Sequence, residues 1–422
     1  MTESVREGQY KLIDFYLTTP GGNQLSLREI CAGANIYESI LEPAVIADFE
    51  FYDAKGVFNH FVFTEQSIIL EWTTDFEGDS TVKYEFIPIQ VDPVLPRPDQ
   101  RGIAYKITCI TPEAHRSLSR RDISLVREKL TCETVVKRVL EQLESEKPFF
   151  GEQTRGLYTF DSRNKKPFEF IDEIRLKKAM SNEFQGHAFV FFENSKGFVF
   201  KSIEKLIAEG LENIGDKYFF QSPTANMDVT ASKWRNIIAQ KIVQNGNQAI
   251  ARRIGAGKNK VVQKNTVTGE LEPFETDPKR LEFQTLNKGS ISSSLSDQRK
   301  FSENDGKKTV VAFDDRQETG SLAEKVQQLP FFLSGFLSTI AHITVFGDTL
   351  ITAGDVITCE LPEMDGLAND PENPTKKISN ISAGNFLVTK CRHVLSFNEK
   401  AEYIQAYEIV KDGIGGELPA TQ

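Results

Sequence analysis

Histidine and cysteine are the side chains that most often carry metal or nucleophilic chemistry, and this chain has five of each. The histidines are spread along the sequence, and no two stand at a metal-binding spacing such as His-x-x-x-His. We therefore interpret each as a structural or surface residue. His187 and His393 fall in β-type patterns, where an imidazole ring can simply pack. The full set is His60, His115, His187, His342 and His393.

The cysteines are equally dispersed, and none forms a Cys-x-x-Cys pair. An odd number of widely spaced cysteines does not suit a disulfide framework. We predict reduced, mostly buried thiols of a protein made in the cytoplasm, with neither disulfides nor a zinc site. These residues are Cys31, Cys109, Cys132, Cys359 and Cys391.

The segment Gly255-Ala-Gly257-Lys258 is similar to a phosphate-binding loop. A P-loop requires Gly-x-x-x-x-Gly-Lys followed by Ser or Thr, directly after an apolar strand. Arg252 and Asn259 occupy the positions of the first glycine and of the hydroxyl residue, and no apolar strand precedes them. We interpret the segment as a flexible, lysine-rich loop.

Other catalytic patterns are equally poorly supported. Acidic residues are plentiful, but no apolar pocket can be argued around a glycosidase pair, and no Gly-x-Ser-x-Gly elbow occurs. The net charge of −10 argues against binding of nucleic acid through its phosphates, so we interpret the short basic clusters 116–121 and 252–253 as salt-bridged surface. We predict no enzyme activity and no catalytic, cofactor-binding or metal-binding residue.

The N-terminal part of the sequence is predicted to be rich in β-strands. Strand patterns run over 45–52, 67–72 and 81–91, with a turn at Asp53-Ala-Lys-Gly56. A further strand is predicted over 102–111. Pro88 places part of the third strand at a sheet edge, because proline cannot donate to a ladder.

The period then changes to that of helices. Apolar residues at helical spacing predict a helix over 131–146, capped by Thr131, and a second over 168–180 that begins after Pro167. Two Phe- and Val-rich runs then flank Asn194-Ser-Lys-Gly197, where Gly197 can take a positive φ. Ser202 has the short oxygen side chain of a helix N-cap. This stretch predicts a hairpin that leads directly into a helix.

The remaining sequence is first irregular and then β-rich. Residues 231–251 have helical character, the polar stretch 263–308 suggests loops and irregular strands, and a helix over 321–328 is interrupted by Pro330. We find no repeat of about 20–50 residues. The C-terminal strands are predicted over 341–346, 355–361, 385–395 and 401–411.

A chain of 422 residues with 39% hydrophobic content exceeds one ordinary core, so we expect roughly two to four domains. The layout predicts an α+β, β-rich multidomain protein. The 31 phenylalanines suggest aromatic cores or subunit interfaces. The predicted division is a first β domain over 1–115, an α+β domain with the aromatic hairpin over 116–210, a loop-rich insertion over 211–325 and a second β domain over 326–422.

Neither a signal peptide nor a transmembrane segment is expected. The N-terminus lacks a basic region followed by an apolar one, and no apolar run approaches about 18 residues. We therefore expect synthesis in the cytoplasm without membrane insertion.

Three segments resemble the central baseplate hub proteins of contractile-tailed bacteriophages. The first is Asp48-Phe-Glu-Phe-Tyr-Asp-Ala-Lys-Gly56, a strand that ends in a turn. The second is Pro167-Phe168, a helix and the aromatic hairpin 187–200. The third is the C-terminal series of strands and Gly-Asp turns over 346–410. Their order covers roughly residues 40–410, and the middle part, 208–320, matches only loosely.

The resemblance implies two tube-like β domains near the chain ends, with a mixed α/β middle. Three copies would close into a pseudo-sixfold ring that joins the sixfold tail tube to the threefold central spike. The implied partners are two further copies, the tail spike protein, the tail tube protein or a tube–baseplate adaptor, and other baseplate proteins. Genomic DNA would pass through the lumen without specific binding, repelled by the acidic chain. The implied location is the tail baseplate of the virion.

Two alternatives remain open. A type VI secretion-like spike complex has a related hub portion, but we expect no fused spike here, because the sequence stops just past the closing hairpin. A tail-associated cell-wall or polysaccharide hydrolase would need a paired acid and base, for which the sequence offers no candidates.

Overall fold

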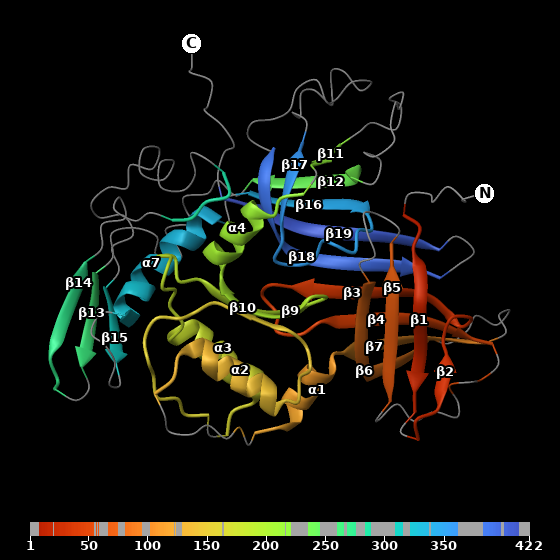
Figure 1. Ribbon diagram of the computed structural model, residues 1–422, viewed down its shortest axis with the longest axis horizontal. Helices are drawn as coiled ribbons and strands as arrows, with labels where there is room; N and C mark the ends of the chain where they lie inside the picture. The colour runs from red at the N-terminus through yellow and green to blue at the C-terminus, as the bar shows by residue number, and fades with distance from the viewer. Residues whose placement is uncertain are drawn as a thin grey trace, which may run out of the picture.

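A computed structural model gives the fold of the chain (Figure 1). The structure describes residues 8–19, 21–54, 56, 58, 66–74, 81–94, 102–121, 123, 129–162, 164–215, 217–220, 235–244, 260–265, 268–275, 283–287, 309–314, 321–336, 339–361, 383–397 and 401–412. The predicted phosphate-loop-like segment 255–258 lies outside these residues. None of the helices in the described ranges is both long and apolar enough to span a bilayer.

A 13-stranded, mostly antiparallel sheet contains strands from both ends of the chain (Figure 1). Its N-terminal strands are β1 (Lys11–Thr18), β2 (Gln24–Ser26), β3 (Cys31–Ser39), β4 (Ile46–Asp53), β5 (Ser67–Thr73), β6 (Thr81–Val94) and β7 (Ile103–Ile110). Its C-terminal strands are β11 (Tyr218–Phe219), β12 (Ile237–Gln244), β16 (Thr339–Phe346), β17 (Val356–Glu360), β18 (Gly384–Ser396) and β19 (Glu402–Lys411). The order is β12-β16-β19-β18-β3-β4-β7-β6-β5-β1-β2, with β17 and β11 attached beside β18.

Two three-stranded sheets and a group of helices lie beside this large sheet. The first small sheet has the order β8-β10-β9, and the second has the order β14-β13-β15. Their strands are β8 (Phe149–Gly151), β9 (Phe189–Asn194), β10 (Gly197–Ser202), β13 (Lys260–Asn265), β14 (Leu271–Glu275) and β15 (Thr309–Asp314). The helices are α1 (Pro112–Ser119), α2 (Cys132–Gln142), α3 (Pro167–Lys177), α4 (Ile203–Glu212) and α7 (Ser321–Phe336). The protein is thus β-rich, as predicted, with few helices.

The aromatic hairpin β9–β10 is buried on both faces. Phe191 and Phe198 stack at 5.7 Å between ring centroids on the face toward helices α2 and α3. Phe192 and Val199 point to the opposite face, into the core of the C-terminal strands. A strand pair that is covered on both sides needs apolar side chains on both faces, which explains the Phe/Val runs 189–192 and 198–200.

The helix that follows the hairpin begins at the predicted cap. The Ser202 hydroxyl accepts a hydrogen bond from the backbone N–H of Lys205, and Thr131 caps α2 in the same way through Thr134. We expect Ser202→Ala to lower the free energy of unfolding by about 1 kcal/mol, because a partly buried helix N–H loses its acceptor. Thermal unfolding would measure the loss, and Ser202→Thr, which keeps the hydroxyl, should recover most of it.

The large sheet contains the same five-strand unit twice. In chain order the first repeat is β3, β4, β5, β6 and β7, and the second is β12, β16, β17, β18 and β19. Both repeats pair their strands in the order first, second, fifth, fourth, third, and all these pairs are antiparallel.

The irregularities of the pairing also recur. The register shifts between Cys31 and Gly33 in the first repeat and between Ile237 and Ala239 in the second. The long fourth strand has its shift between Pro88 and Gln90 and, 300 residues later, between Val388 and Lys390. Since bulges are designed features that persist within families, their recurrence indicates a duplicated unit. The division of the whole chain at 115, 210 and 325 stays a prediction.

Two local predictions were wrong. Helical character was expected over 231–251, but Ile237–Gln244 is strand β12, an edge strand whose β-branched residues suit its pairing with β16. The helix at Ser321 does not end before Pro330 but continues to Phe336. The C-terminal strands, in contrast, are confirmed as β16 to β19.

Candidate functional site

The two repeats meet where β3 pairs with β18 (Figure 1). The register places Cys391 opposite Glu38 and Arg392 opposite Tyr37. This junction joins segments more than 300 residues apart in the sequence into one continuous sheet. We call it the intrachain junction and treat it as the centre of the candidate site, because it determines how one repeat lies beside the next.

Glu38 is the buried polar centre of the intrachain junction, with 1% of its surface exposed. Its carboxylate accepts backbone N–H groups from Ser195 at 3.1 Å and Ala353 at 3.0 Å. It also accepts the hydroxyls of Tyr84 and Thr352. These donors come from the first repeat, the aromatic hairpin and the loop before β17. One side chain therefore connects three parts of the chain.

The imidazole of His393 completes this network. Its Nε2 lies 3.2 Å from the Glu38 carboxylate, and its Nδ1 lies 2.7 Å from the Tyr403 hydroxyl. Burial alone would raise the pKa of Glu38, but the neighbouring His393 and the hydroxyl donors outweigh it and lower that pKa to about 2. Glu38 is therefore ionised at all ordinary pH values.

Glu38, Cys391 and His393 also form a group with potential metal ligands within 4.8 Å of one another. Both oxygens of Glu38 already accept hydrogen bonds from the protein. Burial raises the pKa of the Cys391 thiol well above its usual value, which disfavours the thiolate that a metal would bind. The arrangement therefore favours a hydrogen-bonded network over a metal centre.

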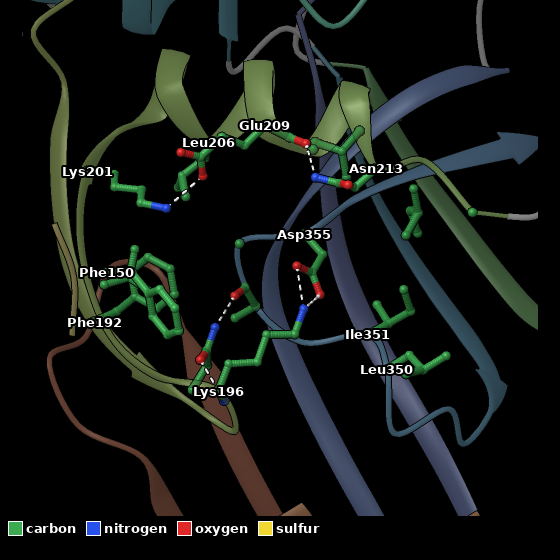
Figure 2. Close-up of a pocket in the computed structure, with 18 of the residues that line it drawn as sticks. Phe150, Phe192, Lys196, Lys201, Leu206, Glu209, Asn213, Leu350, Ile351 and Asp355 are labelled. Atoms are coloured by element: carbon green, nitrogen blue, oxygen red, sulfur yellow. Dashed lines mark hydrogen bonds and ion pairs between the residues drawn. The ribbon is translucent and has the colours of Figure 1, made fainter. Parts of the chain in front are cut away.

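A cleft of about 440 Å³ lies beside the junction, between α4, the β8–β10 strands and the loop before β17 (Figure 2). Its apolar wall includes Phe192 and the partly exposed Phe150. Lys196 pairs with Asp355 at 2.7 Å, and Lys201 pairs with Glu209 at 2.6 Å (Figure 2). Each of these lysines is thus paired with a carboxylate of the cleft wall, and burial raises the pKa of Asp355 despite its pairing with Lys196.

The duplicated sheet has two open stretches of strand edge within the described residues. β12 pairs with β16 on one side, and only its start meets β11 through an isolated bridge at Asn236. In β6, residues 81–86 pair with β5, but residues 87–94 pair only with β7. Ile238 on β12 and Ile89 on β6 are about half exposed, at 44% and 49%. Open edges are strong candidates for pairing with another chain.

The structure brings together two of the residues singled out in the sequence, Cys391 and His393, whose Sγ and Nε2 atoms lie 3.4 Å apart. All five cysteines are buried and free, as predicted. Arg120 pairs with Glu144 at 2.6 Å, which confirms the salt-bridged reading of that basic cluster. His187 does not lie in a strand but precedes β9 with a φ of 50°. Sequence reasoning missed Glu38, whose signal is an acidic residue in phase with the buried positions of its strand, Ala34 and Ile36.

A duplicated, continuous β-sheet with an α+β insert is thus the class of fold that the chain adopts. Similar solved structures are a tail protein from Neisseria meningitidis MC58 and a tail protein of prophage MuSo2 from Shewanella oneidensis. The first has a TM-score of 0.53 at 10% identity and covers 96% of this chain and 98% of its own. The second has a TM-score of 0.51 at 10% identity and covers 94% of this chain and 98% of its own.

No family model matches the chain, and neither does any curated protein sequence. At 10% identity the two structures establish the fold alone. The chain therefore has the fold of phage tail proteins, and the resemblance to the tail baseplate proteins predicted from the sequence is confirmed at that level.

Proposed function

We propose that this chain is a structural virion protein, the baseplate hub of a phage tail, with no catalytic role. Three copies form a pseudo-sixfold ring that joins the tail tube to the central spike and leaves a passage for the genome. The observation that carries this proposal is the duplicated unit within one continuous sheet. Three chains with two repeats each present six similar units, which is what a joint between sixfold and threefold parts requires.

The fold of the two bacterial and prophage tail proteins supports a place in the tail. The proposed partners are accordingly the spike protein on one side and the tube protein, or a tube–baseplate adaptor, on the other. Other baseplate proteins would contact the periphery. The proposed location is the tail baseplate of the virion.

The polar face of the duplicated sheet suits a passage for DNA. The side chains of this face belong to positions that alternate with the buried ones, and several pair across strands, such as Lys106 with Asp48 at 3.1 Å and Lys390 with Glu408 at 2.9 Å. The lysines of these two pairs are neutralised by carboxylates, which weakens their attraction for DNA phosphates. DNA held by few phosphate contacts slides freely.

The mass of the purified chain in solution tests the ring. We expect light scattering of the chain, co-expressed with the neighbouring spike protein, to give a hub assembly containing three chains of 47.5 kDa each. Ring-shaped particles should be visible by electron microscopy. A hub that remains monomeric or dimeric with the spike present would contradict the proposal, and release of fragments from purified peptidoglycan would favour the hydrolase alternative.

A further inference from the structure

The intrachain junction shows how one repeat joins the next, and the same rule can be applied to the two open edges. At this junction the fourth strand of the second repeat, β18, pairs with the first strand of the first repeat, β3. Two stretches with one partner strand are left among the described residues, and they form the corresponding pair. They are residues 87–94 of the fourth strand of the first repeat, β6, and the first strand of the second repeat, β12.

The register of this contact follows from the equivalence of the repeats. The bulge in β3 between Cys31 and Gly33 corresponds to that in β12 between Ile237 and Ala239, so β12 is offset from β3 by 206 positions. Residues in β6 and β18 correspond at an offset of 300, as their pairing with β7 and β19 shows. The observed pair Arg392–Tyr37 then corresponds to Asp92–Val243.

We propose that β12 of one copy pairs antiparallel with residues 90–94 of β6 in a second copy of this chain, with Asp92 opposite Val243. This inference rests on the proposed ring and names its contact. The contact is heterologous, since each copy offers one edge to each neighbour, and such contacts generate closed rings when the rotation closes. It would turn the sheets of separate copies into one continuous band.

The charges on the two edges are complementary in this register. At the intrachain junction the Arg392 guanidinium donates to the Asn35 side-chain oxygen at 2.8 Å, diagonally across the strands. The equivalents of these two residues are Asp92 on β6 and Lys241 on β12, and both are exposed. The proposed contact therefore has a carboxylate and an ammonium group where the intrachain junction has a guanidinium–amide hydrogen bond. Side chains that are diagonal neighbours on adjacent strands lie close enough to form such an ion pair.

Pro93 makes the proposed contact weaker than the intrachain one. At the intrachain junction, Ile40 N–H donates to the Thr389 carbonyl at 3.0 Å. Every second residue of an antiparallel strand makes such backbone hydrogen bonds to the same neighbour, so the backbone N–H and C=O of His393 also point toward β3. Pro93 is the equivalent of His393, so its nitrogen faces the open edge and can donate no hydrogen bond. The ladder between copies loses this bond, and we infer an association that depends on concentration and is strengthened by partners.

Cysteine cross-linking tests the register in the full chain. Asp92 and Val243 correspond to a pair that is not hydrogen-bonded, where Cα atoms approach to about 4.5 Å and a disulfide can close. We expect the double variant Asp92→Cys with Val243→Cys, oxidised in the presence of the spike protein, to form covalent dimers and trimers on a non-reducing gel. The five native cysteines are buried and give a low background.

A matched control places the first cysteine at Glu85, on the half of β6 that pairs with β5. Glu85→Cys with Val243→Cys should not cross-link between copies. In a second test, either Asp92→Lys or Lys241→Glu should weaken association by about tenfold, and the two together should restore it. Both residues are exposed, so the folded chain should be unaffected.

These experiments distinguish a failure of the proposed strand pairing from a failure of the proposed trimeric ring. Cross-linking in a three-chain hub assembly supports both, and cross-linking in an assembly of another size supports the contact but contradicts the trimer. A three-chain ring that does not cross-link at this pair overturns the proposed register and leaves the function standing. A chain that stays monomeric with the spike present and does not cross-link overturns both.

Discussion

Replacing Glu38 with glutamine is expected to lower the free energy of unfolding by about 3–5 kcal/mol, the cost of breaking a buried, hydrogen-bonded charge network. The amide would place its N–H₂ group against a donor that now faces a carboxylate oxygen, either the backbone N–H of Ser195 or that of Ala353. His393 would lose its carboxylate partner at the same time. Because these groups belong to three parts of the chain, the loss should loosen the intrachain junction itself.

Tryptophan fluorescence during urea denaturation would measure this effect. The Trp72 ring lies 5.9 Å from that of His393, so its emission reports on the junction. The matched control is Glu50→Gln, on the exposed side of the neighbouring strand β4, which should change stability by less than about 0.5 kcal/mol. Equal effects of the two substitutions would show that the Glu38 network does not hold the repeats together.

The same side chain determines part of the acid sensitivity. The pKa of Glu38 is lowered from its ordinary 4.5 to about 2 in the folded state, so the folded chain binds fewer protons there than the unfolded chain. Its stabilising effect is therefore complete above about pH 4.5 and is lost as the pH falls toward 2. Glu38→Gln should flatten the stability curve in this window, and an unchanged slope would contradict the lowered pKa.

Glu204 should act in a different window. Burial raises the pKa of Glu204 to about 7, so the folded chain binds a proton there more tightly than the unfolded chain does. The contribution of Glu204 therefore lowers the free energy of unfolding progressively as the pH rises from about 4.5 to 7. The two carboxyl groups thus have opposite signs, although both are buried acids in a β-rich core. Both carboxylates accept hydrogen bonds from the protein, and the difference comes first from the imidazole of His393 beside Glu38.

Local patterns predicted the elements well where they depend on short-range chemistry. The aromatic hairpin, the caps at Thr131 and Ser202 and the C-terminal strands all follow from periodicity and turn residues. The prediction of a helix over 231–251 was wrong because a short run of β-branched residues fits the periodicity of a helix and that of a strand. Its pairing with β16 makes it a strand. Local propensity cannot contain this information.

The duplicated sheet and the Glu38 network could not be predicted, since both depend on which strands become neighbours. Only two aligned positions between β6 and β18 keep the same residue, Phe86 with Phe386 and Val94 with Val394. Strand alternation constrains the chemical class of each side chain but not its identity. The duplication is therefore visible in the order of strand pairing and in the positions of the bulges, and not in the amino-acid identities.

Gly197→Ala is expected to cost about 3 kcal/mol or more, for two separate reasons. Gly197 has a φ of 139°, a conformation that L side chains rarely adopt, and this strain alone costs about 1–3 kcal/mol. A Cβ atom at this position would also lie 2.3 Å from the carbonyl oxygen of Pro148. Because that oxygen belongs to the backbone and accepts the N–H of Phe198 at 2.9 Å, no side-chain rotation can relieve the contact.

The expected consequence of Gly197→Ala is displacement of β8 from β10 and exposure of the aromatic hairpin, which thermal unfolding and dye binding to apolar surface would detect. Gly22→Ala is the matched control, since Gly22 also has a positive φ of 80° but no atom within 4 Å of its added Cβ. That variant should lose only about 1 kcal/mol, the cost of backbone strain without the contact. If the two variants lose the same stability, the close approach of Pro148 contributes nothing, and the hairpin would be positioned by its two apolar faces alone.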